Sequence, residues 1–446
     1  MSDGRLGLPA SVSIALGGMI GGGIFSVLGL AATIAGARTW LAFTLAGVVA
    51  ACAGYSYNRL NAVSDAKGGS VTYVQQFSQN TTLAGMVGWT LLFGYIGSMA
   101  MYAYAFGSFT VELAGVHSLL GLPTRPLVSA LAVAGFVGLN LVGARASGTT
   151  ENVLVGAKIA ILLLVGGWGA LYGARSGVLD IGATGGVGVS PLVAAAVSFV
   201  AFQGWQLLFY DRDSIRDPDH TIPRAVYVAI VVAVFVYILV AVVATSLLTP
   251  QQILEYEHVA LAKAAEPFMG RAGYALVSVA ALVSTGSAIN ATLFSGAHFA
   301  KGMLSEHLLP DRIGDPTANG VPDRTLVLLG IVTIGFTAAG SLNGVTSFAS
   351  LSFIVVFGAM SALAFTQRHR AAVNPLPPAV GVVGCATFLV LMTYHLAVDE
   401  PNVFGAVILT AVAVFVVELT YFERDRLQRV ASAVEDGLEE RTSNRP

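Results

Sequence analysis

The sequence predicts an all-α integral membrane protein with about twelve transmembrane helices. Its 446 residues are 55% hydrophobic and 11% charged, whereas soluble domains carry roughly 25% charged residues. The mean hydropathy is +0.75, and many apolar runs approach the roughly 20 helical residues that cross a hydrocarbon layer of about 30 Å. Runs such as 225–248 lack the apolar and polar alternation of barrel strands. Helices are therefore expected to cross the membrane.

The apolar runs define the elements in chain order. Windows of roughly 19 residues give twelve spans, at 8–35, 40–61, 84–114, 127–143, 153–172, 192–209, 225–248, 274–300, 326–339, 345–365, 379–396 and 403–421. The first span has no cleavage site, so we interpret it as a membrane helix and not as a signal peptide. Residues 1–422 are thus one transmembrane domain, and residues 423–446 form a charged tail. The segment 250–270 fits either an amphipathic lid helix or a linker.

The distribution of positive charge predicts the orientation, because cytoplasmic loops carry the excess of Lys and Arg. With the N-terminus inside, seventeen of the 23 Lys and Arg residues fall in cytoplasmic segments and five fall outside. An even number of spans then puts both termini in the cytoplasm. The one remaining basic residue, Lys158, lies inside the fifth span.

Composition and motifs exclude several classes of protein. The net charge of −2 provides no basic surface for nucleic acid. Cys52 and Cys385 lie in apolar runs, where buried thiols are the usual interpretation, so neither a disulfide framework nor a metal site is expected. No zinc-protease, phosphate-loop or nucleophile-elbow motif occurs, so we expect no enzyme and no cofactor.

Two spans contain residues that disfavour a continuous helix. In the first, five glycines lie within residues 17–23, and each costs a helix roughly 1 kcal/mol relative to alanine. In the sixth, Gln203, Gly204 and Gln206 interrupt an apolar run. We expect both helices to break there. Close packing of small residues explains the first segment equally well, and a simple kink explains the second.

Broken helices indicate a binding site. Unwound backbone is tolerated in a membrane only where protein buries it or where it lines a wet cavity. Its free N–H groups attract an anion and its free C=O groups attract a cation, so an α-amino acid fits both. The first and sixth spans are equivalent positions if spans one to five and six to ten are inverted repeats, an arrangement that places substrate between the repeats.

Three motifs resemble those of the amino acid–polyamine–organocation (APC) permeases. They are GGMIGGGIF at 17–25, FVAFQGWQ at 199–206 and DRDSIRDPDHTIPRAV at 211–226, and the resemblance covers nearly the whole chain. It implies a LeuT-like fold, with ten core helices as a 5+5 inverted repeat and two peripheral C-terminal helices. The third motif departs from the family pattern at 216–218, where an acidic residue followed by Asn-Pro is usual.

The resemblance also implies a substrate site. The substrate carboxylate would meet backbone N–H groups near Gly21, Gly22 and Gly23. Its ammonium would meet carbonyl groups of helix one and of residues 199–202. The carbonyls of helix one are those near Gly18 and Met19.

The sixth span supplies the side chains of this implied site. In relatives an aromatic residue closes over the substrate, and Phe199 and Phe202 are the candidates here. Gln203 lies in the expected break. Trp205 either shapes the cavity from below or makes an ordinary lipid or helix contact.

Lys158 requires its own explanation, because a charge at the centre of a membrane helix costs about 2.5 to 3.5 kcal/mol. The resemblance places its ammonium where related sodium-coupled carriers bind sodium. Its partners would be the carbonyl of Gly17 or Ile20 and the hydroxyl of Ser284 or Ser287. Burial favours the neutral form of a lysine, so protonation and deprotonation would fasten and release helix one. This predicts a proton-coupled, sodium-independent mechanism.

Five other polar residues lie in or near apolar spans, where ionisable groups are candidates for function. Glu112 and His298 fall near helix ends, where an interfacial position is inexpensive. Asn140 and Asn290 are expected to hydrogen-bond across helices. His395 is expected to be an incidental interfacial residue.

These observations together predict a secondary active amino-acid transporter that works by alternating access in the cell membrane. Its partners would be a small-molecule amino acid, protons and the lipid bilayer. No acidic residue is placed to select a cationic side chain, so we expect the substrates to be neutral amino acids. Together with the mechanism expected from Lys158, this predicts proton symport of neutral amino acids. The alternatives are an exchanger, a cationic amino-acid or polyamine permease, a channel and a substrate sensor of the same fold.

Overall fold

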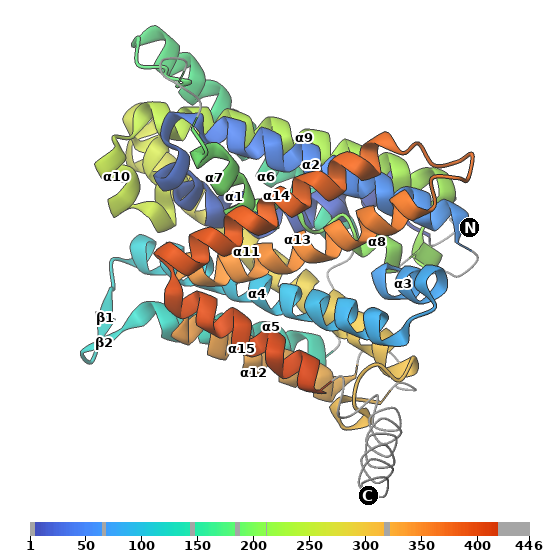
Figure 1. Ribbon diagram of the computed structural model, residues 1–446. Coiled ribbons are helices and arrows are strands. Elements are labelled where there is room, and N and C mark those ends of the chain that lie inside the picture. The colour runs from blue at the N-terminus through green and yellow to red at the C-terminus, as the bar shows by residue number, and fades with distance from the viewer. Residues whose placement is uncertain are drawn as a thin grey trace, which may run out of the picture.

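The computed structural model describes residues 5–64, 68–142, 148–182, 188–210, 212–315 and 322–417. Long helices lie side by side in one bundle (Figure 1). A single short hairpin interrupts the helical structure of the described residues, with β1 (Ser118–Leu119) paired antiparallel to β2 (Leu122–Pro123). The predicted tail at 423–446 lies outside the described residues.

The helices follow the predicted apolar runs closely. The long ones are α1 (Leu8–Ala35), α2 (Thr39–Val63), α4 (Thr81–Ala114), α5 (Thr124–Leu141), α6 (Gly148–Arg175), α9 (Pro218–Leu247), α11 (Ala260–Ser305), α12 (Asp323–Ala339), α13 (Leu342–Thr366), α14 (Leu376–Asp399) and α15 (Pro401–Val417). The short ones are η1 (Gly36–Arg38), α3 (Ser70–Ser78), α7 (Ser190–Val197), η2 (Phe199–Phe202), α8 (Leu207–Tyr210), η3 (Arg212–Ser214), α10 (Pro250–Glu255), η4 (Glu257–Val259) and η5 (Asp311–Ile313).

The predicted class, an all-α membrane protein, is confirmed. Among the described residues, eight helical segments are long and apolar enough to cross a membrane, and the first of them joins α1 and α2. The total of twelve crossings and the 5+5 inverted repeat remain predictions. Apolar side chains such as Phe235, Ile331 and Leu409 are exposed on the outer helices, as expected for surfaces that face lipid.

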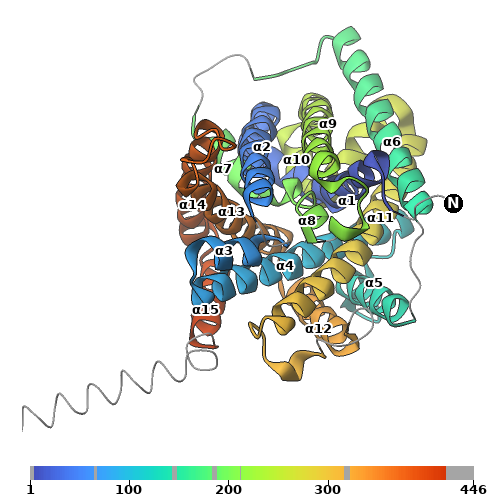
Figure 2. The same cartoon turned by 90° about the vertical axis from the view of Figure 1, so that its right-hand side faces the viewer.

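Helix α1 lies in the centre of the bundle. All of its residues from Ala15 to Ala32 are buried, whereas a helix at the surface exposes one face. It packs against α9, α11, α6, α7 and α2 (Figure 2). The first span is therefore the core of the fold, where a substrate would be enclosed by the surrounding helices.

The segment 250–270 is helical rather than an irregular linker. It comprises α10, η4 and the first part of α11, which bends at Gly270. Gly270 has φ +60°, a conformation that glycine adopts most easily. Thr249 and Gln252 form a capping box that starts α10. This segment covers the end of the bundle at which α1 finishes.

Candidate functional site

The sixth span is broken where the sequence predicts. Helix α7 ends at Val197, the 3₁₀ turn η2 follows, Gln203 is extended, and a new helical turn begins at Leu207. Gly204 permits this path, because its φ is +127° and a Cβ there would lie 2.7 Å from the Cα of Gly18. The break is therefore pressed directly against α1.

The predicted break in the first span is wrong. Helix α1 runs without interruption from Leu8 to Ala35, so the N–H groups of its glycines are engaged within the helix. The glycines serve close packing instead, which was the alternative explanation. A Cβ would lie 2.6 Å from the Gly204 Cα at Gly18, 2.9 Å from the Ala288 Cβ at Gly21, 1.8 Å from the Tyr102 ring at Gly22, and 2.9 Å from the Ala201 Cα at Gly23.

Tyr237 on α9 ties the two implicated segments together. Its hydroxyl donates to the carbonyl oxygens of Met19 and Ala201, at 2.7 and 3.0 Å. These carbonyls belong to the two segments that the resemblance assigns to the substrate ammonium. A hydroxyl carries one proton, so at any moment Tyr237 gives a full hydrogen bond to only one of the two carbonyls.

Ser350 on α13 satisfies further backbone groups of the break. Its Oγ accepts a hydrogen bond from the Val200 N–H at 3.0 Å and donates one to the Val197 carbonyl at 2.6 Å. Buried backbone groups that lack such partners are costly. The broken segment is therefore held by side chains from the surrounding helices.

A network of amides continues from the break. The Gln203 amide donates to the Tyr102 hydroxyl, and the Gln206 amide donates to the Gln203 oxygen at 3.2 Å. The Gly204 N–H in turn donates to the Gln206 oxygen at 2.6 Å. Gln203 and Tyr102 thus connect the break to the face of α1 on which Tyr102 covers Gly22.

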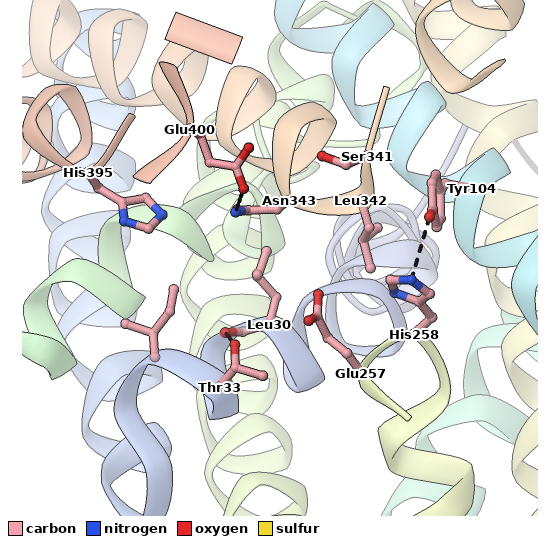
Figure 3. Close-up of a pocket in the computed structure, with 11 residues that line it drawn as sticks. Leu30, Thr33, Tyr104, Glu257, His258, Ser341, Leu342, Asn343, His395 and Glu400 are labelled. Atoms are coloured by element: carbon pink, nitrogen blue, oxygen red, sulfur yellow. Dashed lines mark hydrogen bonds between the residues drawn. The ribbon is translucent and has the colours of Figure 1, made fainter. Parts of the chain in front are cut away.

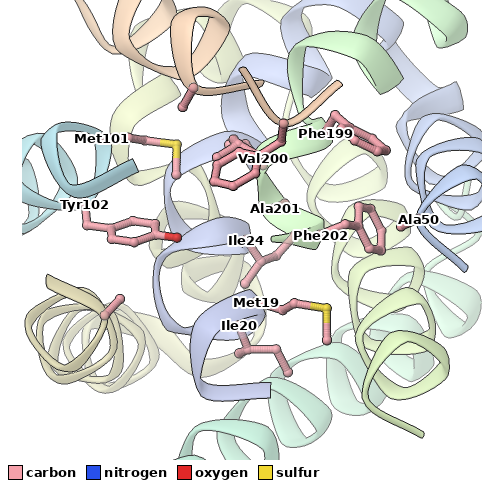
Figure 4. Packing of buried hydrophobic residues seen from close by; sticks show 14 of the residues in the cluster. Met19, Ile20, Ile24, Ala50, Met101, Tyr102, Phe199, Val200, Ala201 and Phe202 are labelled. Carbon is pink, nitrogen blue, oxygen red and sulfur yellow. The ribbon is translucent and has the colours of Figure 1, made fainter. Parts of the chain in front are cut away.

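The aromatic residues of the sixth span are fully buried. The ring of Phe202 lies 5.3 Å from that of Tyr237, whereas Phe199 lies 5.6 Å from Phe388 on α14. In the view of Figure 4, both rings lie toward Ala50, away from Tyr102. Of the two gate candidates, Phe202 is therefore the one that contacts Tyr237, whose hydroxyl donates to a carbonyl of the break.

Trp205 belongs to the protein interior and does not contact lipid. It is fully buried, with ring centroids 4.9 Å from Phe357 and 5.1 Å from Tyr57. The Tyr57 hydroxyl lies 2.7 Å from the Ser70 Oγ, which lies 3.1 Å from the Tyr210 hydroxyl. An aromatic layer and a polar layer therefore separate the break from the end of the bundle at which α1 begins.

The same end is closed by a second polar cluster. Arg212 donates to Asn61 at 2.5 Å and to Asp219 at 2.6 Å. Tyr73 on α3 also donates to Asn61, at 3.2 Å. Burial raises the pKa of the Tyr73 hydroxyl, so it remains a donor at physiological pH.

The start of the described chain adds a backbone link to this closure. The Leu6 N–H donates to the Ser214 carbonyl, and the Leu6 carbonyl accepts from the Arg216 N–H, both at 2.8 Å. Because Leu6 lies two residues before the start of α1, the loop after the broken span and the central helix are joined at this end.

Lys158 lies on a helix that packs near its expected partners. Lys158 on α6 is 2% exposed, and α6 packs against both α1 and α11. Ser284 on α11 donates to the Ile20 carbonyl at 3.2 Å. Gly17 is buried in α1, and Ser287 lies one turn after Ser284 and is half-buried. The structure thus brings Ser284 and Ile20 together beside the helix that carries Lys158.

The prediction for Asn140 and Asn290 is confirmed. The Asn140 amide donates to the Asn290 oxygen at 2.7 Å and joins α5 to α11. Glu112 lies 3.8 Å from His117 near the end of α4, and His298 is exposed. His395 differs from the prediction, because it is buried beside a cavity. Both cysteines are free.

Sequence reasoning missed Tyr237, Tyr102 and Ser350. Tyr237 had a signal, since a buried tyrosine hydroxyl within the apolar run 225–248 needs a partner. Ser350 had none, because α13 also carries Ser347 and Ser352. Within the described residues, no group of three His, Cys, Asp or Glu side chains is arranged to hold a metal ion.

Comparison with known proteins gives a consistent result. The family model described as amino acid permease matches residues 6–417. The inner membrane transport protein YbaT of Escherichia coli is 32% identical, over 82% of this chain and 84% of its own length. The methylthioribose transporter of Bacillus subtilis is 26% identical over 80% and 79%. The human Asc-type amino acid transporter 1 is 25% identical over 92% and 80%.

Proposed function

The chain belongs to the amino acid permease family, and we propose that it couples the uptake of neutral amino acids to protons by alternating access. Members of this family and the relatives named above are membrane transporters and not enzymes. Family membership establishes a membrane transporter. The proposal adds the substrate, the coupling ion and the orientation of the termini.

One observation carries the proposal: the broken sixth span meets the glycine face of α1. Gly18 and Gly204 touch backbone to backbone, and Tyr237 binds a carbonyl of each segment. Polar backbone deep in a membrane protein is the feature that substrate sites of secondary carriers use. An ammonium group, which carries three donors, can replace the single proton of Tyr237 at these carbonyls.

We assign the substrate contacts to this meeting of α1 and the broken span. On α1 they are Gly18, Met19, Gly21, Gly22 and Gly23, and on the broken span they are Phe199, Phe202, Gln203 and Trp205. Because the N–H groups of α1 are engaged within a continuous helix, these α1 contacts require the helix to unwind there when the site opens. None of these side chains is charged, which favours a neutral substrate over a cationic one. The relatives include both an amino-acid transporter and a methylthioribose transporter, and a substrate screen distinguishes these two classes.

We assign proton coupling to Lys158. Burying a lysine is costly, and this one lies on a helix packed against α1 and α11. When protonated, its ammonium would hold α6 to the carbonyls of Gly17 or Ile20 and the hydroxyls of Ser284 or Ser287. When deprotonated, it would release them and allow α1 to move. A proton would thereby bias which side of the site opens.

The closed end of the bundle supports alternating access. Arg212, Asn61 and Asp219 close it with polar contacts, and Trp205 and Tyr57 form the layer above them. Opening this end requires those contacts to separate. The asymmetric distribution of Lys and Arg favours a cytoplasmic location for this end and for both termini.

Transport into proteoliposomes tests the proposal. Uptake of a neutral amino acid should rise with an inward proton gradient, ignore sodium, and be lost in Lys158→Ala while substrate binding survives. The matched control is Lys263→Ala, which removes a lysine paired with Glu266 at 2.6 Å near the other end of the bundle and should leave uptake unchanged. Sodium-driven uptake, or equal uptake by both variants, would contradict the assignment.

Counterflow separates the alternatives. Preloading with unlabelled substrate accelerates entry of the labelled substrate in a carrier, has no such effect in a channel, and leaves a sensor without uptake. If labelled substrate enters only liposomes that are preloaded with substrate, the protein is an exchanger and not a symporter. A preference for lysine, arginine or polyamines in a screen of substrates would overturn neutral specificity.

A further inference from the structure

A cavity lies at the end of the bundle where α1 finishes. Its volume is about 420 Å³, within the range of small-molecule sites. Glu400, Asn343 and Ser341 reach it from one side in Figure 3, and Thr33 and Glu257 reach it from the other. None of the residues assigned to the central site lines it. The lining residues are Leu30, Thr33, Ile34, Tyr104, Glu257, His258, Ser341, Leu342, Asn343, His395 and Glu400.

The charged side chains that line this outer cavity are two carboxylates. Glu257 lies on η4, and Glu400 follows the end of α14. No lysine or arginine is among the lining residues. Asn343 donates to one oxygen of Glu400 at 2.6 Å, and the second oxygen of a carboxylate can accept a hydrogen bond from a ligand. Two carboxylates around one cavity repel each other, so a cation between them is favourable.

His395 adds an acceptor at the wall of the cavity. Its Nδ1 lies 2.7 Å from a carboxylate oxygen of Asp399, and an ionised carboxylate only accepts, so Nδ1 carries the proton. In the neutral form of the ring, Nε2 then presents its lone pair as an acceptor. His395 is 8% exposed, and within the described part of the chain its Nε2 has no hydrogen-bond partner. Such buried polar atoms are rare and call for an explanation.

The position of Glu257 is built into the central helix. A Cβ at Gly29 of α1 would lie 2.0 Å from the Glu257 carbonyl oxygen, so only glycine lets η4 approach this closely. The Tyr104 hydroxyl lies 3.5 Å from His258 Nε2 on the same segment. The backbone of η4, which carries the Glu257 side chain, is thus held against α1 and α4.

We propose that the outer cavity, lined by Glu257, Glu400 and His395, binds the primary ammonium group of a small amine or amino acid. An ammonium offers three donors and one positive charge, which complements two carboxylates and an imidazole lone pair. Leu30, Ile34 and Leu342 provide apolar surface for a short alkyl chain. A metal ion fits less well, because the described residues contain no suitable group of three ligands.

The test uses the purified full-length chain with isotope-labelled histidine. The chain has only seven histidines, so the NMR spectrum contains few signals. His395→Gln and His258→Gln assign the two signals from the cavity. Propylamine should shift both in a saturable manner, and propionate, of the same size but opposite charge, should not. The double variant Glu257→Gln/Glu400→Gln should bind propylamine at least tenfold more weakly. Glu255→Gln, an exposed carboxylate on neighbouring α10, is the matched control and should bind normally.

Alanine, added as a third probe, distinguishes two sources of the ammonium. Shifts by alanine and propylamine alike support a site that accepts amino acids, and shifts by propylamine alone support a site for amines without a carboxylate. Equal shifts by propylamine and propionate, or no saturable shift by propylamine, would overturn the proposal on the unmodified protein alone. Equal affinity in the double variant and Glu255→Gln would overturn it as well. Transport plays no part in these measurements, so failure of the proposed function would not affect them.

Discussion

Tyr237→Phe is the sharpest perturbation of the central site. The substitution removes one oxygen atom and keeps the ring, whose centroid lies 5.3 Å from both Phe43 and Phe202. It deprives the Met19 and Ala201 carbonyls of a donor at 2.7 and 3.0 Å. Because one proton serves both, we count the loss of one hydrogen bond and not two. Met19 keeps its intrahelical bond in α1, so the Ala201 carbonyl is the acceptor left without this donor, and such a loss costs about 1–3 kcal/mol.

Tyr237→Phe should therefore lower the free energy of unfolding by about 1–3 kcal/mol, measured by denaturant titration in mixed micelles. The control Tyr394→Phe removes a hydroxyl from an exposed tyrosine of α14 and should change stability by no more than about 0.5 kcal/mol. If the two variants unfold alike, Tyr237 does not bridge α1 and the broken span. Substrate affinity should also change in Tyr237→Phe and not in the control, because the released carbonyls belong to the assigned site.

Three further experiments test other parts of the account. Gly18→Ala puts a Cβ 2.6 Å from the Gly204 Cα and should destabilise the fold by about 1–3 kcal/mol. The control Gly167→Ala has open space around its Cβ and should stabilise the fold by about 0.5–1 kcal/mol. Equal effects of the two substitutions on thermal unfolding would refute the packing explanation. Phe202→Leu should weaken substrate binding up to roughly tenfold through loss of an aromatic contact, and an unchanged affinity in a binding titration would remove Phe202 as the gate. A double-mutant cycle of Asn140→Ala and Asn290→Ala should give a coupling energy of about 0.6–1.7 kcal/mol; additive effects on unfolding would show that the bond at 2.7 Å contributes nothing.

The sequence predicts the membrane helices and the break in the sixth span because both depend on local chemistry. Long apolar runs have one favourable conformation in a hydrocarbon layer, and Gly204 beside two amides disfavours a continuous helix. The Asn140–Asn290 bond is predictable for a similar reason, because amides inside apolar spans need partners.

The error at α1 arises because glycine has two uses that look alike in a sequence. It weakens a helix, but it also lets neighbouring groups approach, and only the positions of Tyr102, Ala201 and Gly204 show that packing prevails. The outer cavity was not predictable either. His395 and Glu257 are 138 positions apart in the sequence, and their common cavity depends on the path of η4 over α1.

Movement of protons driven by substrate tests the central claim most directly. Proteoliposomes that hold a pH indicator, with equal pH and sodium on both sides, receive a neutral amino acid from outside. If Lys158 couples transport to protons, the interior should acidify as the amino acid enters. Lys158→Ala should then bind the amino acid without acidification, and Lys263→Ala should behave like the parent protein. Entry of the amino acid into liposomes of the parent protein without any change of internal pH would contradict proton coupling.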